Sequence, residues 1–163
     1  MIIQPRGAED KMHYFAYGNL MDIDLMLSSC PSAQAIAVAR LDGHELRFVK
    51  CTDTAHGGCT LIEDPQAVTW GVHYEMSEAD RAALDASAGI KERRWALKPI
   101  TVTATDGRRI DTVTYFIPDD RGAHRPSDSY VGPIHKGAAA LNLPADYRAR
   151  LREIIDEALA IGA

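Results

Sequence analysis

A strand that breaks at a glycine and runs into a helix is the feature that most constrains this chain. It is the stretch Tyr14-Phe15-Ala16-Tyr17-Gly18-Asn19-Leu20. Its aromatic-rich first half predicts a strand, and a helix-like pattern follows from Met21 to Met26. Unpaired backbone N–H groups at such a break, with the positive end of the helix dipole, form a site for a carboxylate or an oxyanion. Gly18 would let the backbone approach a ligand, although a plain strand-to-helix turn is the alternative.

Short β-type runs and turn signals continue along the first half of the chain. We expect a short helix over 22–29, stopped by Pro31. Two strand pairs should follow, 33–41 with 45–49 and 59–62 with 68–74. Asp42-Gly43 is a strong hairpin signal for the first pair, and Asp64-Pro65 marks the expected turn of the second.

The second half begins with a helix whose expected N-cap is Ser77 and whose end is Gly89. The expected elements are a helix over 78–86, strands over 95–103 and 110–117, and helices over 130–141 and from 144 onward. Pro133 restricts where the first C-terminal helix can start. The elements together predict an α+β fold: a small, mainly antiparallel (mixed) β-barrel flanked by helices, in a single domain over 12–161.

Composition limits the classes of function. The chain has 163 residues and 46% hydrophobic content, enough for one globular core. A net charge of −5 and the lack of a basic run argue against nucleic acid as the main partner. No apolar stretch suits a signal peptide or a membrane span, so we expect a cytoplasmic protein with no membrane partner. Cys30, Cys51 and Cys59 lack Cys-x-x-Cys spacing and are expected to be free thiols.

No motif in the sequence indicates a metal ion or a cofactor. The six histidines show no His-x-x-x-His or His-x-His pattern, so no zinc site is predicted. A Walker A loop, G-x-G-x-x-G and G-x-S-x-G are absent as well. His56-Gly57-Gly58 could form an oxyanion loop, but without a serine elbow to serve it is expected to be a turn.

Several segments, taken in order, resemble the γ-glutamylcyclotransferase superfamily, which includes the AIG2-like proteins. Tyr17-Gly18 followed by a small polar residue resembles the Tyr-Gly-Ser-Asn or Tyr-Gly-Thr-Leu signature of that superfamily. The other matching segments are Pro31-Ser32-Ala33, Val38-Ala39-Arg40-Leu41, His56-Gly57-Gly58, Trp70-Gly71-Val72, Leu84-Asp85, Pro126-Ser127-x-x-Tyr130, Gly137-Ala138 and Leu143-Pro144-x-x-Tyr147. The resemblance spans about residues 14 to 155 and is strongest to the enzymes that take γ-glutamyl amino acids.

This resemblance implies a transferase or lyase type of reaction in glutathione metabolism. Backbone N–H groups of the Tyr-Gly loop bind the γ-glutamyl group, and a glutamate moves protons while the substrate's α-amine attacks its own γ-carbonyl. The products are 5-oxoproline and a free amino acid or amine, and neither a metal nor another cofactor takes part. The matching pocket positions are Tyr17, Gly18, Asn19, Leu20, Trp95, Tyr115 and Tyr130. We expect the loop and residue 88 to line one cavity with both later tyrosines, although core packing is the alternative role for the aromatic side chains.

Ala88 is the main departure from the superfamily pattern. The superfamily glutamate lies in a Leu-Asp-x-x-Glu-Gly context, where this chain reads Leu84-Asp85-Ala86-Ser87-Ala88-Gly89. Ala88 can neither accept nor donate a proton. Three explanations stay open: an engineered Glu-to-Ala variant, a natural pseudo-enzyme, or another carboxylate in its place, of which Glu92 is nearest in sequence. Asn19-Leu20 also departs from the Ser-Asn of the glutathione branch.

Two main classes of function follow from this pattern. The first is a γ-glutamylcyclotransferase-type protein, inactive or nearly so with Ala88, that would release 5-oxoproline from γ-glutamyl amino acids or amines. The second is a non-catalytic small-molecule binding or regulatory protein on the same scaffold, and an interaction module with a vestigial pocket is a third reading. A small γ-glutamyl molecule is the expected partner in the first case, and a homodimer stays open.

Overall fold

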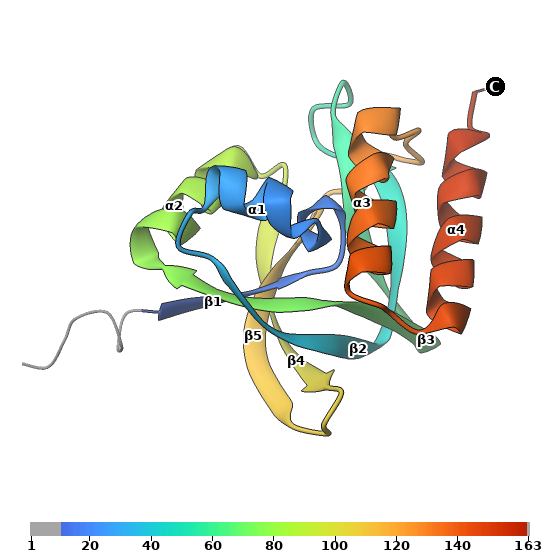
Figure 1. Cartoon of the computed structure of the whole chain (residues 1–163). Helices are drawn as coiled ribbons and strands as arrows, with labels where there is room; N and C mark the ends of the chain where they lie inside the picture. Colours follow the sequence, from blue (N-terminus) through green and yellow to red (C-terminus); the bar gives the residue numbers. More distant parts are fainter. Residues whose placement is uncertain (1–10, 163) are drawn as a thin grey trace, which may run out of the picture.

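Within the described residues, five strands form one curled sheet and four α-helices accompany it. Figure 1 shows how the helices are placed relative to the sheet. The computed structural model describes residues 11–162. Its elements are β1 (Lys11–Ala16), the 3₁₀ helix η1 (Asn19–Met21), α1 (Ile23–Ser29), β2 (Gln34–Lys50), β3 (Gly57–Ser77), α2 (Glu78–Ser87), β4 (Ala96–Ala104), β5 (Arg109–Phe116), α3 (Asp128–Ala140) and α4 (Ala145–Leu159). The expected α+β class is confirmed.

The sheet is open, so the expected closed barrel is wrong. Its strand order is β1-β3-β2-β4-β5, and every pair of neighbouring strands is antiparallel. The weak point is the contact of β2 with β4, where only Ala39 with Ala104 and Arg40 with Thr103 are in register. Beyond these pairs the β4–β5 hairpin bends away from β2, which curls the sheet without closing it.

The two edge strands, β1 and β5, come close but are joined by side chains instead of a backbone ladder. The Thr114 hydroxyl donates to the Phe15 carbonyl oxygen at 2.7 Å. The Tyr17 hydroxyl donates to the Tyr115 carbonyl oxygen at the same distance. These two hydrogen bonds from hydroxyl groups to backbone carbonyls connect the edges of β1 and β5.

The expected hairpin at Asp42-Gly43 is also wrong, because β2 runs through it as one strand. Asp42 pairs with Val68 and His44 with Glu63, and Gly43 bulges out between them with a φ of +75°. An Asp-Gly pair supplies positive φ equally well to a two-residue turn and to a β-bulge. The sequence therefore indicated positive φ at Gly43 correctly, but the hairpin inferred from it was wrong.

On the partner strand, the same irregularity replaces the expected turn at Asp64-Pro65. Residues 64–67 have no partner in the β2–β3 register, yet β3 continues past them to Ser77. Proline has no backbone N–H to give to a ladder, so it fits a segment that has left the ladder. The two predicted strand pairs are therefore one long antiparallel pair with a shared interruption.

The helix ends follow the capping residues that the sequence indicated. The Ser77 side chain accepts from the N–H of Asp80 at the start of α2, and Gly89, with a φ of +68°, ends that helix. Asp22 caps α1 in the same way. Pro133 does not define the start of α3, which begins at Asp128 and contains the proline inside its length.

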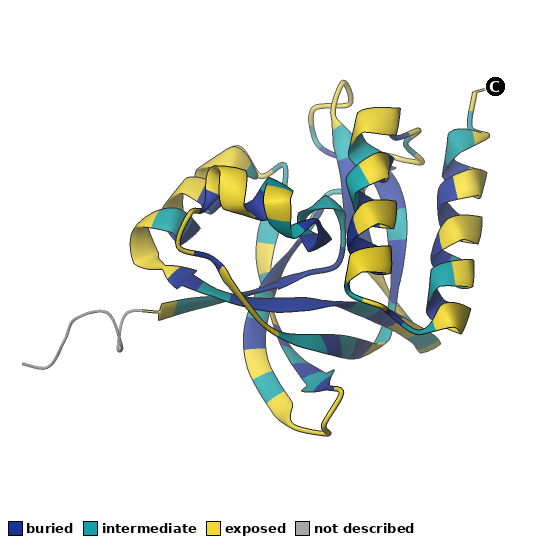
Figure 2. Cartoon of the chain, in the orientation of Figure 1, coloured by how far each residue is buried: buried dark blue, intermediate teal, exposed yellow. Residues whose placement is uncertain are grey.

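Helices α3 and α4 lie against the sheet with one buried face each, as the striped ribbons in Figure 2 show. The buried face of α4 consists of Tyr147, Leu151, Ile154, Ile155 and Ala158. Each fully buried large aliphatic side chain contributes about 1.5–3 kcal/mol, so this face is enough to hold α4 in place. Within residues 11–162, no helix has the length and apolar character needed to cross a membrane.

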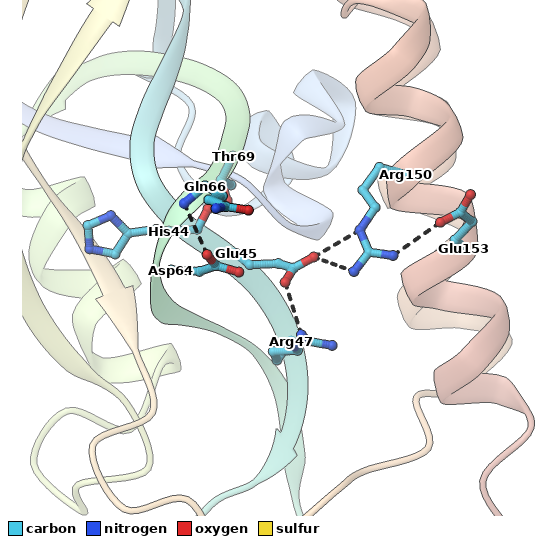
Figure 3. A network of polar contacts seen from close by, with 8 residues as sticks. All are labelled: His44, Glu45, Arg47, Asp64, Gln66, Thr69, Arg150 and Glu153. Atoms are coloured by element: carbon cyan, nitrogen blue, oxygen red, sulfur yellow. Dashed lines mark hydrogen bonds and ion pairs between the residues drawn. The ribbon is translucent and has the colours of Figure 1, made fainter.

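A polar network adds orientation to this apolar packing (Figure 3). Arg150 of α4 contacts one carboxylate oxygen of the buried Glu45 on β2 through two guanidinium nitrogens, at 2.9 Å and 2.5 Å. Arg47 of β2 donates to the other oxygen at 2.9 Å. Two contacts from one guanidinium to a single oxygen restrict the orientation of the Arg150 side chain, so they help to set the position of α4 along β2.

Candidate functional site

One cavity brings together every pocket residue predicted from the sequence. Its volume is about 310 Å³, and it lies where the end of β1, η1, α2 and the start of α3 meet. The predicted residues that line it are Tyr17, Gly18, Asn19, Leu20, Ala88, Trp95, Tyr115 and Tyr130. The further lining residues, which the sequence did not single out as pocket positions, are Tyr14, Leu25, Ser29, Cys59, Leu84 and Ser87. What each residue does there remains a prediction.

A second, larger hollow lies between β2, β3 and α4. Its volume is about 520 Å³, and its wall includes Arg40, Glu45, Asp64 and Arg150. Two of these charged groups already neutralise each other in the Glu45–Arg150 ion pair. A ligand would have to compete with that pairing, so the cavity lined by aromatic hydroxyls is the better candidate site.

The backbone of Cys59 holds three of the predicted side chains in position. Its N–H donates to the Tyr130 hydroxyl oxygen at 3.1 Å. Its carbonyl oxygen accepts from the indole N–H of Trp95 at 3.1 Å and from the Tyr17 hydroxyl at 3.3 Å. The shorter bond of the Tyr17 hydroxyl goes to the Tyr115 carbonyl, so this hydroxyl serves the wall and not a ligand. The only sequence signal for Cys59 was the His-Gly-Gly segment before it.

Gly58, near the start of β3, lies where a side chain would meet two of the cavity's aromatic rings. A Cβ at this position would lie 2.7 Å from the Tyr130 hydroxyl oxygen and 2.8 Å from Cζ2 of Trp95. Both distances are too short for any real contact, so only glycine lets the two rings approach the strand this closely. The two rings then form one continuous wall of the cavity.

The loop after β1 has the strand-to-helix break that the sequence predicted. The carbonyl oxygens of Gly18 and Asn19 accept from the N–H groups of Met21 and Asp22, each at 3.1 Å. Asn19 and Leu20 begin η1, and the first N–H groups of a helix have no acceptor within it. The Tyr74 hydroxyl donates to the Leu20 carbonyl at 2.7 Å and so connects the loop to β3.

The absence of a Cβ at Gly18 matters for a different reason than expected. A Cβ there would lie 3.3 Å from Sγ of Cys59, which is buried beside the loop. The side chain that a Cβ at Gly18 would contact is therefore Cys59, which lines the same cavity. The lack of a Cβ serves the packing of Cys59 as much as the approach of a ligand.

The titratable groups of the wall are all neutral at physiological pH. Burial raises the pKa values of Tyr14, Tyr17, Tyr115 and Tyr130 well above the usual value for a phenol. Burial also raises the pKa of the Cys59 thiol to about 12, so it is no thiolate nucleophile. The cavity offers hydrogen-bond donors, and none of these groups can act as a base near pH 7.

Ala88 follows the last residue of α2 and is one of the residues that line the cavity. Its N–H bonds to the Leu84 carbonyl at 2.9 Å, and the chain then turns away at Gly89. Glu92 is exposed and is not among the lining residues, so the structure gives no support to its replacing a glutamate at position 88. Among the described residues that line the cavity, none is a carboxylate.

One carboxylate, Asp85, lies directly behind the wall. It accepts from the Tyr115 hydroxyl at 2.5 Å and from Nε of Arg81 at 3.1 Å. Arg81 is buried and also donates to the His13 carbonyl at 2.8 Å, which ties α2 to β1. With two donors on one of its oxygens, Asp85 orients Tyr115 and is shielded by it from the cavity.

Comparison with known proteins places these features in a family context. Residues 68–151, just over half of the chain, match the AIG2-like family. No curated protein matches the chain. The matched segment contains α2, Ala88 and three of the cavity's aromatic side chains, but it does not reach the loop after β1.

Solved structures cover the chain more fully. A γ-glutamyl cyclotransferase is 27% identical, with a TM-score of 0.82 over 87% of this chain and 86% of that chain. An uncharacterised protein from Homo sapiens is 28% identical, with a TM-score of 0.83 over 88% of each chain. A γ-glutamyl cyclotransferase specific to glutathione, from yeast, is 15% identical with a TM-score of 0.61 over 93% of this chain and 98% of that one, which shows a shared fold alone.

Proposed function

The chain belongs to the AIG2-like family, and from this premise we propose that its cavity binds γ-glutamyl amino acids or amines. The reaction type is that of the γ-glutamyl cyclotransferases, in which the bound group closes to 5-oxoproline. With Ala88 in place of a carboxylate, this chain binds the substrate and cyclises it slowly at best. It is a binding scaffold of cyclotransferase type whose proton carrier is missing.

The observation that carries the proposal is the composition of one cavity wall. The start of η1 supplies free N–H donors, the tyrosines supply neutral hydroxyls, and the residue 88 position supplies only a methyl group. Donors of this kind suit a carboxylate and a developing oxyanion. The wall therefore has what binding needs and lacks what proton transfer needs.

The roles follow from the chemistry of the ring closure. The α-carboxylate of the γ-glutamyl group accepts from the N–H groups of Asn19 and Leu20. The Tyr130 hydroxyl, which accepts from Cys59, still has its own proton to donate to the substrate. The α-ammonium must lose a proton before it attacks, and the leaving amine must gain one. A carboxylate at position 88 would do both, and Ala88 can do neither.

The lack of a proton carrier at position 88 should lower the rate of cyclisation by a predictable factor. A positioned general acid or base contributes roughly 10²–10⁴ in rate, which is about 3–5 kcal/mol of barrier. Asp85 is not among the residues that line the cavity, and its Oδ1 accepts from both Tyr115 and Arg81, so we do not assign it this role. A role as a non-catalytic binding or regulatory protein is the second candidate function, and the lack of any lining carboxylate is the observation that favours it.

Titration calorimetry with a pair of isomers tests the binding claim. γ-Glutamyl-alanine and α-glutamyl-alanine have the same composition and charge but differ in which carboxyl group forms the amide. We expect the γ-isomer to bind at least about tenfold more tightly, a difference of about 1.4 kcal/mol, because only it leaves the α-carboxylate free beside the α-amine. Equal affinities, or no binding of γ-glutamyl-alanine, γ-glutamyl amines and glutathione alike, would remove the basis for the proposal.

A further inference from the structure

Three metal-binding side chains meet on one face of the sheet, away from the residues that line the cavity. His13 of β1 lies directly opposite Glu75 of β3 in the antiparallel register. His73 precedes Glu75 by two residues, so both side chains point to the same face of β3. The two histidines are 60 residues apart in the sequence, which is why no spacing pattern could connect them.

The distances among these groups suit coordination of one ion. Nδ1 of His13 and Nε2 of His73 are 3.1 Å apart, and the ring planes are inclined by 15°. One ligand atom from each of the three residues lies within 4.8 Å of the others. Two nitrogens bound to one tetrahedral Zn²⁺ at about 2.0–2.1 Å would be roughly 3.3 Å apart. Only small side-chain shifts separate the observed arrangement from a coordinated one.

We propose that His13, His73 and Glu75 form a binding site for a divalent transition-metal ion, with Zn²⁺ as the best fit. Imidazole nitrogens with one carboxylate oxygen are a donor set that suits Zn²⁺ and its neighbours in the series, whereas Mg²⁺ and Ca²⁺ prefer oxygen alone. Three protein ligands leave a fourth position for water.

The burial of His73 supports this assignment. The side chain is 1% exposed, and within the described residues its Nδ1 has no hydrogen-bond partner. The missing partner for Nδ1 also limits affinity, because ligating histidines normally donate their second N–H to an outer acceptor.

The site would act as a clamp on the edge strand of the sheet. It joins β1 to β3 four residues before Tyr17, where the cavity loop begins. Lys11, which lies 3.6 Å from Glu75, would have to give up an exposed ion pair that contributes little. Bound Zn²⁺ would therefore stabilise the strand that carries the loop, whether or not the cavity binds γ-glutamyl compounds.

The test uses the full chain without any histidine tag, stripped of metal by a chelator. Co²⁺ is titrated first, because its visible absorption reports tetrahedral coordination, and Zn²⁺ is then added to displace it. We expect one equivalent to bind, and Zn²⁺ at 100 times its dissociation constant to raise Tm by about 5–10 °C. His13→Gln keeps a hydrogen-bonding side chain beside His73, and it should weaken binding by at least the roughly 10–100-fold that loss of an outer-shell partner costs.

Two further variants make the result decisive. Glu75→Gln alters a partly exposed position without touching the histidine pair, and it should weaken Zn²⁺ binding in the same way. His135→Gln removes an exposed histidine of α3 and should leave both the Co²⁺ spectrum and the shift in Tm unchanged. The proposal is overturned if the natural chain gives no tetrahedral Co²⁺ spectrum, if His13→Gln and Glu75→Gln bind as tightly as the natural chain, or if His135→Gln abolishes binding.

Discussion

At the scale of single residues, the cavity depends on backbone atoms of β3 more than on reactive side chains. The N–H and carbonyl of Cys59 fix Tyr130, Trp95 and Tyr17, while its thiol stays neutral and buried against Gly18. A residue that positions others through its backbone leaves little trace in a sequence, because any side chain of suitable size can occupy the position. The neighbouring Gly58 is visible in the sequence because no other residue fits there.

The contact between Gly18 and Cys59 yields a prediction about this loop. Gly18→Ala places a methyl group 3.3 Å from Sγ of Cys59, so the loop or the thiol must move. We expect overpacking of about 1–2 kcal/mol, seen as a roughly tenfold loss of γ-glutamyl-alanine affinity in calorimetry. In a Cys59→Ala background the same change should cost less than about threefold, because the crowding atom is gone.

The double variant separates two explanations of Gly18. If the methyl group instead blocks the ligand directly, the loss of affinity will be the same in both backgrounds. A loss that persists undiminished in the Cys59→Ala background would therefore contradict the packing explanation. Circular dichroism of the single and double variants provides the control for folding.

At the scale of elements, α3 supports the cavity loop through a glycine. A Cβ at Gly137 would lie 2.5 Å from the Met21 carbonyl carbon and 2.7 Å from the Asp22 nitrogen, both backbone atoms that cannot swing aside. Lys136, the preceding residue, pairs with Asp22 at 3.2 Å and with Asp24 at 3.0 Å. The backbone of α3 therefore packs closely against η1, and Lys136 forms ion pairs with residues at the start of α1.

Two glycines of the same helix give a matched comparison. Gly137→Ala should lower the free energy of unfolding by about 1–3 kcal/mol, because the added methyl group overlaps backbone that has no room. Gly132→Ala, where nothing lies within 4 Å, should raise it by roughly 0.5–1 kcal/mol, because alanine is the better helix former. Urea unfolding of the two variants measures both effects, and a rise in the free energy of unfolding for Gly137→Ala as large as that for Gly132→Ala would contradict the close contact of α3 with the loop.

The elements also show where sequence reasoning succeeded and where it stopped. The helix cap at Ser77 was predicted from the sequence, because capping is decided by residues within one turn of each other. The bulge at Gly43 was mistaken for a hairpin, because turn and bulge make the same demand on φ and differ only in what lies across the sheet. Nearby residues in the sequence determine a helix cap, whereas the partner strand determines whether an Asp-Gly pair forms a turn or a bulge.

At the scale of the whole molecule, contacts between residues far apart in the sequence were the features that could not be predicted. The α+β class followed from the pattern of expected strands and helices, and the grouping of Tyr17, Trp95 and Tyr130 around one cavity was implied by the family resemblance. The open sheet did not, because closure depends on how far β4 follows β2, and only two residue pairs are in register there. The His13–His73 contact was equally invisible, since cross-strand neighbours share no fixed spacing in the sequence.

We propose that this cavity is a γ-glutamyl cyclotransferase site that lacks one carboxylate. We would measure the initial rate of 5-oxoproline release from γ-glutamyl-alanine by Ala88→Glu, with Ala88→Gln as a control of nearly equal size that cannot act as a general acid or base. We predict that the glutamate variant is faster than both the glutamine variant and the unsubstituted chain by roughly 10²–10⁴. Equal rates for the glutamate and glutamine variants, both at background, would contradict the claim.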